Sequence, residues 1–282
     1  MIASRHNNKT IRKKRARRVG LMLAIVFLMI FFIGKLISDP EERVAEESIH
    51  PVAAKVAEQS IIQDTIQPEK QKRPDGKPMG KVVYLTFDDG PSILTNQFLD
   101  VLKEQDIKAT FFMQGSNLLK TNLQEKAKRA TNEGHYVGAH SMTHMKEKLY
   151  DQGQFVPEMN ETLALIQEIT GTNPKLVRPP YGSAPGLESE QIRHQIVESG
   201  IKIWDWTIDS NDWGLKENPS QIVENIKKGT KHDIEVVLMH EKSQTLKVLP
   251  EIISFYREKG YAFGVYNDAD HFNLNFYQDK HL

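Results

Sequence analysis

The chain has 282 residues, of which 39% are hydrophobic and 26% charged, a balance that excludes a fibrous or wholly disordered protein. It contains no cysteine, which excludes a disulfide framework, a thiol nucleophile and a cysteine zinc site, so that any metal must be bound by His, Asp or Glu. Lysines and arginines equal the acids in number, at 37 each, but eight of the basic residues lie within residues 1–18 and no acid does. The remainder is acidic, so we expect no nucleic-acid partner.

The basic residues 1–18 run directly into an apolar stretch, 19–37, in which Lys35 is the one charged residue. Nineteen residues at about 1.5 Å each nearly span a hydrocarbon core of about 30 Å. A cleaved signal peptide is an alternative, although no small-x-small site follows, and a buried core helix is a third. The cations should stay in the cytoplasm. We therefore predict a basic cytoplasmic tail (1–18), a single-pass transmembrane anchor in the cell membrane (19–37) and an extracellular remainder.

Residues 38–80 are polar, rich in charge and punctuated by proline, with few aromatic residues. Such a composition cannot bury a core. We expect an extended extracellular linker, or stalk, over this range.

From residue 81 onward, short apolar runs alternate with amphipathic stretches. The apolar runs predict strands at 82–87, 109–113, 136–140, 175–178, 201–206, 235–239 and 261–266. The amphipathic stretches predict helices at 95–105, 120–133, 157–170, 187–199, 219–228 and 245–259. Alternation of this kind indicates an α/β fold with a mostly parallel sheet. Periodicity alone leaves open an incomplete barrel and an open doubly wound sheet.

Five polar clusters follow predicted strands, where parallel α/β folds place their ligands. They are TFDDGP (86–91), HSMTH (140–144), RPPYG (178–182), DSNDW (209–213) and LMH (238–240). Each alone has an ordinary interpretation as a turn, a chance pair of histidines, a loop or a piece of core. His140 and His144 are four residues apart, which on a helical turn puts both imidazoles on one face, as a metal requires.

Together and in this order, the five clusters resemble those of the polysaccharide deacetylases, carbohydrate esterase family 4 with its NodB homology domain. The resemblance covers about residues 80–270 and extends to bacterial peptidoglycan N-acetylglucosamine deacetylases. It implies a distorted, incomplete (β/α) barrel as the catalytic domain (81–270), followed by a C-terminal tail (271–282).

The resemblance also implies a metal site and its base. Asp89, His140 and His144 would bind a divalent metal, usually Zn²⁺, with Co²⁺ or another divalent ion as alternatives. Three protein ligands leave a position open for water and substrate, as a catalytic site needs. Asp88 would be the general base that takes a proton from the attacking water. Arg178 would hold Asp88 ionised and oriented through a charge-assisted hydrogen bond.

The remaining roles that the resemblance implies concern the substrate. The backbone N–H of Tyr181 would stabilise the oxyanion of the tetrahedral intermediate. His240 would be the general acid that protonates the departing amine, with Asp212 fixing its tautomer. Trp213 and Leu238, together with Tyr181, would line a pocket for the acetyl methyl group.

Three residues of the chain are informative when it is compared with the family pattern. Glu241 stands where an aspartate commonly follows the histidine, and Ala139 stands where a polar residue is more usual. Neither change removes a ligand or a catalytic group. Asp89 argues against a related subgroup that acts on muramic acid residues, which typically has asparagine there.

We therefore expect metal-dependent hydrolysis of the N-acetyl group of N-acetylglucosamine in a cell-wall glycan, namely peptidoglycan, because an anchored enzyme acts on what lies just outside the membrane. Two alternatives share the fold: a chitooligosaccharide deacetylase and an O-acetyl esterase of the xylan type. A third is a non-catalytic protein that binds wall glycan.

Overall fold

The computed structural model describes residues 72–282 of the chain. The predicted cytoplasmic tail (1–18), the predicted anchor (19–37) and most of the predicted linker (38–80) lie outside the described residues. Within residues 72–282, no helix is both long enough and apolar enough to cross a membrane.

The described chain alternates strands and helices. The strands are β1 (Val82–Gly90), β2 (Thr110–Met113), β3 (Tyr136–Ala139), β4 (Leu176–Val177), β5 (Lys202–Ile203), β6 (Ile208–Asp209), β7 (Ile234–His240) and β8 (Ala262–Gly264). The α-helices are α3 (Thr95–Glu104), α4 (Gly115–Leu118), α5 (Thr121–Asn132), α6 (Phe155–Thr170), α7 (Glu190–Ser199), α8 (Pro219–Gly229) and α9 (Ser243–Glu258). A π-helical turn, η1 (Glu147–Asp151), and two 3₁₀ turns, η2 (Asp212–Gly214) and η3 (Asp268–Asp270), complete the set.

The predicted elements are confirmed except at 201–206, where one predicted strand corresponds to β5 alone and a second strand, β6, follows. The backbone N–H of Trp204 donates to Val177 beside β5, at 3.1 Å, whereas the N–H of Thr207 donates to Val236 of β7, at 2.9 Å. Within three residues the backbone therefore changes its hydrogen-bonding partner from β4 to β7. A pattern of apolar residues in the sequence does not predict such a change of partner.

The sheet is parallel throughout, in the order β5-β4-β3-β2-β1-β7-β6, and β8 pairs with β1 along Val82–Tyr84. Its two end strands, β5 and β6, are consecutive in the chain. The five steps from Ile203 to Ile208 reach at most about 18 Å. A flat sheet of seven strands would be about 29 Å wide. The sheet must therefore curve until its ends approach each other, which confirms the incomplete barrel and excludes the open doubly wound sheet.

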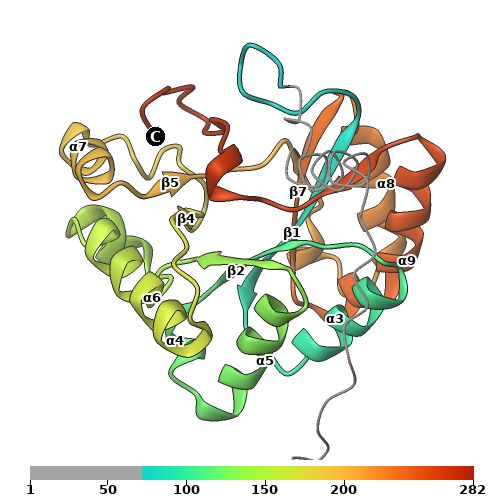
Figure 1. Ribbon diagram of the computed structural model, residues 1–282, viewed down its shortest axis with the longest axis horizontal. Coiled ribbons are helices and arrows are strands. Elements are labelled where there is room, and N and C mark those ends of the chain that lie inside the picture. The colour runs from blue at the N-terminus through green and yellow to red at the C-terminus, as the bar shows by residue number, and fades with distance from the viewer. Residues whose placement is uncertain (1–71) are drawn as a thin grey trace, which may run out of the picture. The chain divides into compact units, whose positions relative to one another are not determined.

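One face of the sheet packs against the helices, which lie around the strands in Figure 1. Alternate residues of β1 (Val83, Leu85 and Phe87) belong to the large apolar core on this side. Contacts between helices run in the order α7, α6, α5, α3, α9 and α8, which follows the strand order. Nearly all of β1 is buried, and its side chains alternate between two different environments with the two-residue period of a strand.

The other face of the sheet carries a second, aromatic cluster. Tyr84 of β1 and Phe112 of β2 meet Trp204, Tyr266 and Phe272 there. Along β1 the same face continues from Tyr84 through Thr86 to Asp88, because side chains two residues apart point the same way. The inside of the barrel is therefore aromatic near the amino ends of the strands and polar near their carboxyl ends.

Gly138 of β3 lies where the backbone of β4 leaves no room for a side chain. A Cβ atom at this position would lie 2.5 Å from the backbone oxygen of Leu176 in β4. We expect Gly138→Ala to lower the free energy of unfolding by about 2 kcal/mol, because neither strand can move away without disturbing the sheet. Urea unfolding followed by circular dichroism measures this. Gly214→Ala, where a Cβ atom would meet nothing within 4 Å, is the control. Equal stability of the two variants would contradict the expectation.

Candidate metal and catalytic site

The predicted site residues meet at the carboxyl edge of the sheet. Asp88 and Asp89 end β1, His140 directly follows β3, Arg178 directly follows β4, and His240 ends β7. In the register of the sheet, Asp88 is the partner of His240 on the adjacent strand. Chain segments more than 150 residues apart therefore converge on one place, as parallel strands require.

Asp89, His140 and His144 form a three-ligand cluster. Oδ1 of Asp89 lies 3.8 Å from Nε2 of His140 and 3.7 Å from Nε2 of His144. One ligand atom from each residue lies within 4.8 Å of the others, and among residues 72–282 this is the one group of three or more such side chains. A carboxylate oxygen and two imidazole nitrogens at this spacing can converge on one cation.

Hydrogen bonds fix the orientation of His140. Its Nδ1 lies 2.8 Å from the carbonyl oxygen of Arg178, which can only accept, so Nδ1 carries the hydrogen and Nε2 offers its lone pair to the cluster. Burial and the proximity of His140 lower the pKa of His144, which favours the neutral imidazole that binds metals. Burial raises the pKa of Asp89, but His140, His240 and His144 outweigh it and leave the pKa lowered. All three side chains thus favour their ligating forms.

Three site residues have a left-handed backbone. The φ angles are 66° at Asp89, 59° at His144 and 68° at Tyr181. Such angles are uncommon outside glycine, cost free energy, and cluster at functional sites. They occur at the carboxyl end of β1, where the strand register shifts, in the His140 loop and in the RPPYG segment.

Asp88 and Arg178 form a buried ion pair. Nη1 of Arg178 donates to Oδ1 of Asp88 at 2.9 Å and to Oγ1 of Thr86 at 2.6 Å. Its Nε and Nη2 donate to the carbonyl oxygens of Trp204 and Asp205, so that the guanidinium cannot turn away. Both side chains are buried. Oδ2 of Asp88 remains directed toward the cluster, 3.8 Å from Nε2 of His140.

His240 and Asp212 form a second pair. Nδ1 of His240 lies 2.7 Å from Oδ1 of Asp212, whose Oδ2 accepts from the backbone N–H of His240, at 2.7 Å, and from the hydroxyl of Thr245. Burial alone lowers the pKa of His240, but the hydrogen bond and negative charge of Asp212, together with the charges of Asp88 and Asp89, outweigh burial and raise it. The imidazolium form therefore persists to higher pH than in an unpaired histidine.

The predicted substrate residues lie beside these pairs. Tyr181 is 56% exposed, its hydroxyl donates to the carbonyl of His144 at 3.1 Å, and no protein acceptor within residues 72–282 takes its backbone N–H. Trp213 follows Asp212 and is 63% exposed, and Leu238 is buried two residues before His240. The acetyl-methyl pocket that these residues are expected to line stays a prediction.

Sequence reasoning missed three buried carboxylates that hold the motif loops. Glu158 of α6 accepts from the backbone N–H groups of Met142 and Thr143 in the HSMTH loop, at 3.1 and 2.9 Å. Glu241 accepts from the backbone N–H of Ser92, at 3.1 Å, and from the hydroxyls of Ser92 and Thr95, just beyond DDGP. Asp205 accepts from the backbone N–H of Ser183, at 2.8 Å, just beyond RPPYG. The sequence gives no signal for these contacts, since acidic side chains are mostly exposed and the presence of Glu241 after His240 does not reveal its partners.

Removal of the Glu158 carboxylate is expected to loosen the HSMTH loop. Glu158→Ala leaves two inward-facing N–H groups without their acceptor, which we expect to lower the free energy of unfolding by about 2–3 kcal/mol and to weaken Zn²⁺ binding. Chemical denaturation and calorimetric zinc titration measure the two effects. Glu161→Ala, on the exposed side of the same helix, is the matched control. Unchanged zinc affinity in Glu158→Ala would contradict this role.

Comparison with known proteins agrees with this geometry. The sequence model of the polysaccharide deacetylase family matches residues 75–204. A peptidoglycan-N-acetylglucosamine deacetylase of Bacillus cereus is 41% identical over 271 residues, or 94% of this chain and 96% of that protein. A putative polysaccharide deacetylase of Bacillus subtilis, YheN, is 44% identical over 196 residues, covering 67% of this chain and 68% of that protein. The crystal structure of a polysaccharide deacetylase from Bacillus cereus, 46% identical, has a TM-score of 0.69 and covers 72% of this chain and 100% of that one.

Proposed function

The chain belongs to the polysaccharide deacetylase family, and we propose that it removes the N-acetyl group of N-acetylglucosamine units in peptidoglycan by metal-dependent hydrolysis. As a member it is a polysaccharide N-deacetylase. The observation that carries the proposal is the completeness of the site: the ligand cluster, the Asp88–Arg178 pair and the His240–Asp212 pair meet at one edge of the sheet.

The ligand cluster fits a divalent cation of the zinc type. One carboxylate oxygen and two imidazole nitrogens, within 4.8 Å of one another, are a donor set that Zn²⁺ accepts, and they leave positions open. We propose Zn²⁺ bound by Asp89, His140 and His144, with Co²⁺ as a working substitute. When bound, the ion would acidify water and polarise the acetyl carbonyl.

The protein's own groups would divide the remaining work. Asp88, held by Arg178, would accept a proton from the attacking water, a role usually worth about 10²–10⁴-fold in rate. The N–H of Tyr181, which has no acceptor within residues 72–282, would donate to the developing oxyanion, typically worth about 3–4 kcal/mol. An amide nitrogen leaves only after it is protonated, and His240, charged with the help of Asp212, would supply that proton.

We propose peptidoglycan as the substrate and the outside of the cell membrane as the place of action. Two features support this: the relative from Bacillus cereus aligned over 94% of the chain is a peptidoglycan-N-acetylglucosamine deacetylase, and residues 1–37 have the pattern of an inside-positive anchor. Protease treatment of intact cells tests the location. Digestion of the catalytic domain without lysis is expected, and protection of it would overturn the placement.

Acetate release by the full-length protein in detergent tests the activity. Peptidoglycan, chitooligosaccharides and acetylxylan are offered to protein treated with a chelator and then supplied with Zn²⁺ or Co²⁺. We expect release from peptidoglycan that stops on chelation and returns with metal. Release that survives chelation would overturn the metal dependence, and greater release from either other glycan would replace peptidoglycan with that substrate.

A further inference from the structure

Residues near the C-terminus pair with the segment that leaves β5. Leu274 forms a parallel bridge with Trp204, and its carbonyl accepts from the backbone N–H of Asp205 at 2.8 Å. The indole N–H of Trp204 donates to the carbonyl of Phe272, also at 2.8 Å. Residues 272–276, here called the strap, therefore run beside the segment that joins β5 to β6 (Figure 1).

Asp205 joins the strap to the RPPYG segment. Its Oδ1 accepts from the backbone N–H of Ser183 at 2.8 Å, and its Oδ2 accepts from the Ser183 hydroxyl at 2.5 Å and from the backbone N–H of Phe276 at 2.7 Å. Its carbonyl oxygen accepts from Nη2 of Arg178 at 2.8 Å. Asp205 and Ser183 are both completely buried. Asp205 thus contacts the strap, the loop that carries Tyr181 and the Arg178 guanidinium that orients Asp88.

The strap also contacts the Tyr181 loop directly. A Cβ atom on Gly182 would lie 2.7 Å from the Phe276 ring and 3.1 Å from Trp206, so these rings pack on the backbone next to Tyr181. Gly182 has a φ of 83°, which a residue with a side chain rarely adopts. The loop that carries Tyr181 therefore contacts both the Asp205 carboxylate and the rings of Phe276 and Trp206.

We infer that Asp205 is a positioning residue for deacetylation, which holds the Tyr181 N–H and the Arg178 guanidinium in their working places by tying the RPPYG segment to the strap. The inference rests on the proposed function of the site. Asp205 touches neither substrate nor metal in this account. It acts through Ser183 and Arg178. In Asp205→Asn, an amide NH₂ replaces one carboxylate oxygen and would face the N–H or O–H donors that this oxygen now accepts from.

Glu235 provides a matched control at the opposite end of the sheet. This buried carboxylate also accepts two backbone N–H bonds, from Lys231 and His232 at 2.7 Å, and one hydroxyl bond, from Thr207. It lies near the amino end of β7, whereas His240 ends that strand. Glu235→Gln therefore costs stability of a similar kind without touching the Tyr181 loop.

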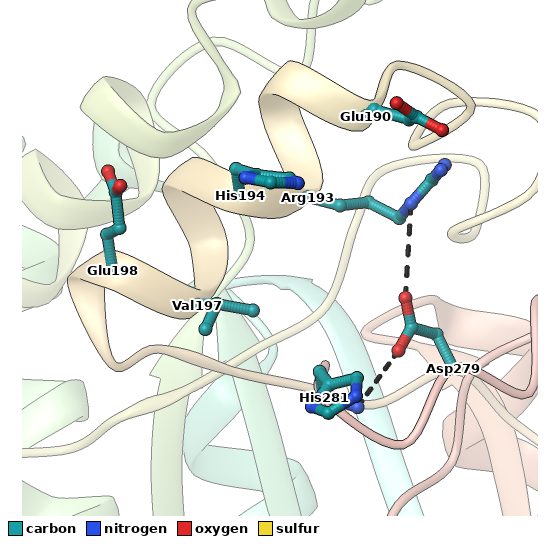
Figure 2. Close-up of a pocket in the computed structure, with 7 residues that line it drawn as sticks. All are labelled: Glu190, Arg193, His194, Val197, Glu198, Asp279 and His281. Carbon is teal, nitrogen blue, oxygen red and sulfur yellow. Dashed lines mark hydrogen bonds and ion pairs between the residues drawn. The ribbon is translucent and has the colours of Figure 1, made fainter.

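A second control separates Asp205 from general attachment of the C-terminal residues. Figure 2 shows a pocket between α7 and the chain end, where Nε of Arg193 lies 3.9 Å from Oδ2 of Asp279 and the backbone N–H of His281 donates to the same carboxylate, at 2.9 Å. Both charged side chains of the ion pair are partly exposed. Arg193→Ala weakens attachment there and leaves the Asp205 contacts in place.

The test compares the zinc-loaded full-length wild type with Asp205→Asn, Ser183→Ala, Glu235→Gln and Arg193→Ala, on N-acetylglucosamine oligomers and on para-nitrophenyl acetate. The ester needs the oxyanion donor but no protonation of its leaving group. We expect Asp205→Asn to lower kcat about 10–100-fold on both substrates with KM changed less than about threefold. Ser183→Ala should show a smaller loss of the same kind, and both controls should stay within about twofold of wild type.

Two results would overturn the inference: a kcat for Asp205→Asn within about twofold of wild type, or equal losses in Asp205→Asn and Glu235→Gln. The ester also separates this inference from the proposed function. If the wild type hydrolyses the ester but no glycan amide, the proposed function fails, while the ester kcat of Asp205→Asn still decides the role of Asp205. If the wild type hydrolyses neither substrate, both fail.

Discussion

Asp88→Asn is expected to lower kcat for acetate release from N-acetylglucosamine oligomers by about 10³-fold, within the range that general bases contribute. Asparagine keeps the size of the side chain and an oxygen for Nη1 of Arg178, now 2.9 Å from Oδ1, but it cannot take up a proton from water. Initial rates with saturating Zn²⁺ measure the loss. Zinc titration of the same variant should show wild-type stoichiometry, because Asp88 is not one of the three proposed ligands.

Asp100→Asn is the control for this variant, since Asp100 is a surface carboxylate paired with Arg129 on the outer side of the barrel. Its rate should equal that of the wild type. A tenfold or smaller loss in Asp88→Asn would contradict the role of Asp88 as the base. Loss of zinc together with activity would instead assign Asp88 to the ligands.

Asp212→Asn is expected to lower kcat at neutral pH by about 10²–10⁴-fold and to change the pH dependence. The carboxylate raises the pKa of His240 against the effect of burial, so its removal lowers that pKa. The protonated imidazole is then lost at lower pH, and the descending limb of the pH–rate profile should shift to lower pH. Rates of both proteins across the pH range measure the shift.

The ester substrate distinguishes this variant from Asp88→Asn. A phenolate leaves without protonation, so Asp212→Asn should lose much less activity on para-nitrophenyl acetate than on the amide. Asp88→Asn should lose activity on both substrates, because in both reactions the attacking water must give up a proton to a base. A descending limb that stays in place in Asp212→Asn would show that His240 is not the acid whose pKa Asp212 sets.

Most of the fold follows from local patterns in the sequence. The runs 82–87 and 235–239 became β1 and β7 because mostly apolar segments that contain valine suit strands buried on both faces. The second half of 201–206 did not become strand, because the hydrogen bonds of Trp204 and Thr207 go to different strands. This change of strand partner depends on the curvature of the whole sheet.

The site was predictable to the extent that its chemistry lies in adjacent residues. TFDDGP and HSMTH each carry their reactive groups within five residues of sequence, and the sheet brings the two together. Glu158 and Asp205 are different, because the backbone N–H groups that they bind are 15 to 71 residues away. Backbone donors leave no mark in the sequence, so such supporting residues emerge only from the structure.

The position of acetyl loss in peptidoglycan tests the central claim most directly. Purified peptidoglycan is incubated with the zinc-loaded protein, cut with a muramidase and analysed by fragmentation mass spectrometry. We predict disaccharides in which N-acetylglucosamine has become glucosamine while the muramic acid residue keeps its acetyl group. Acetyl loss from muramic acid, or intact acetyl groups on both sugars, would contradict the account.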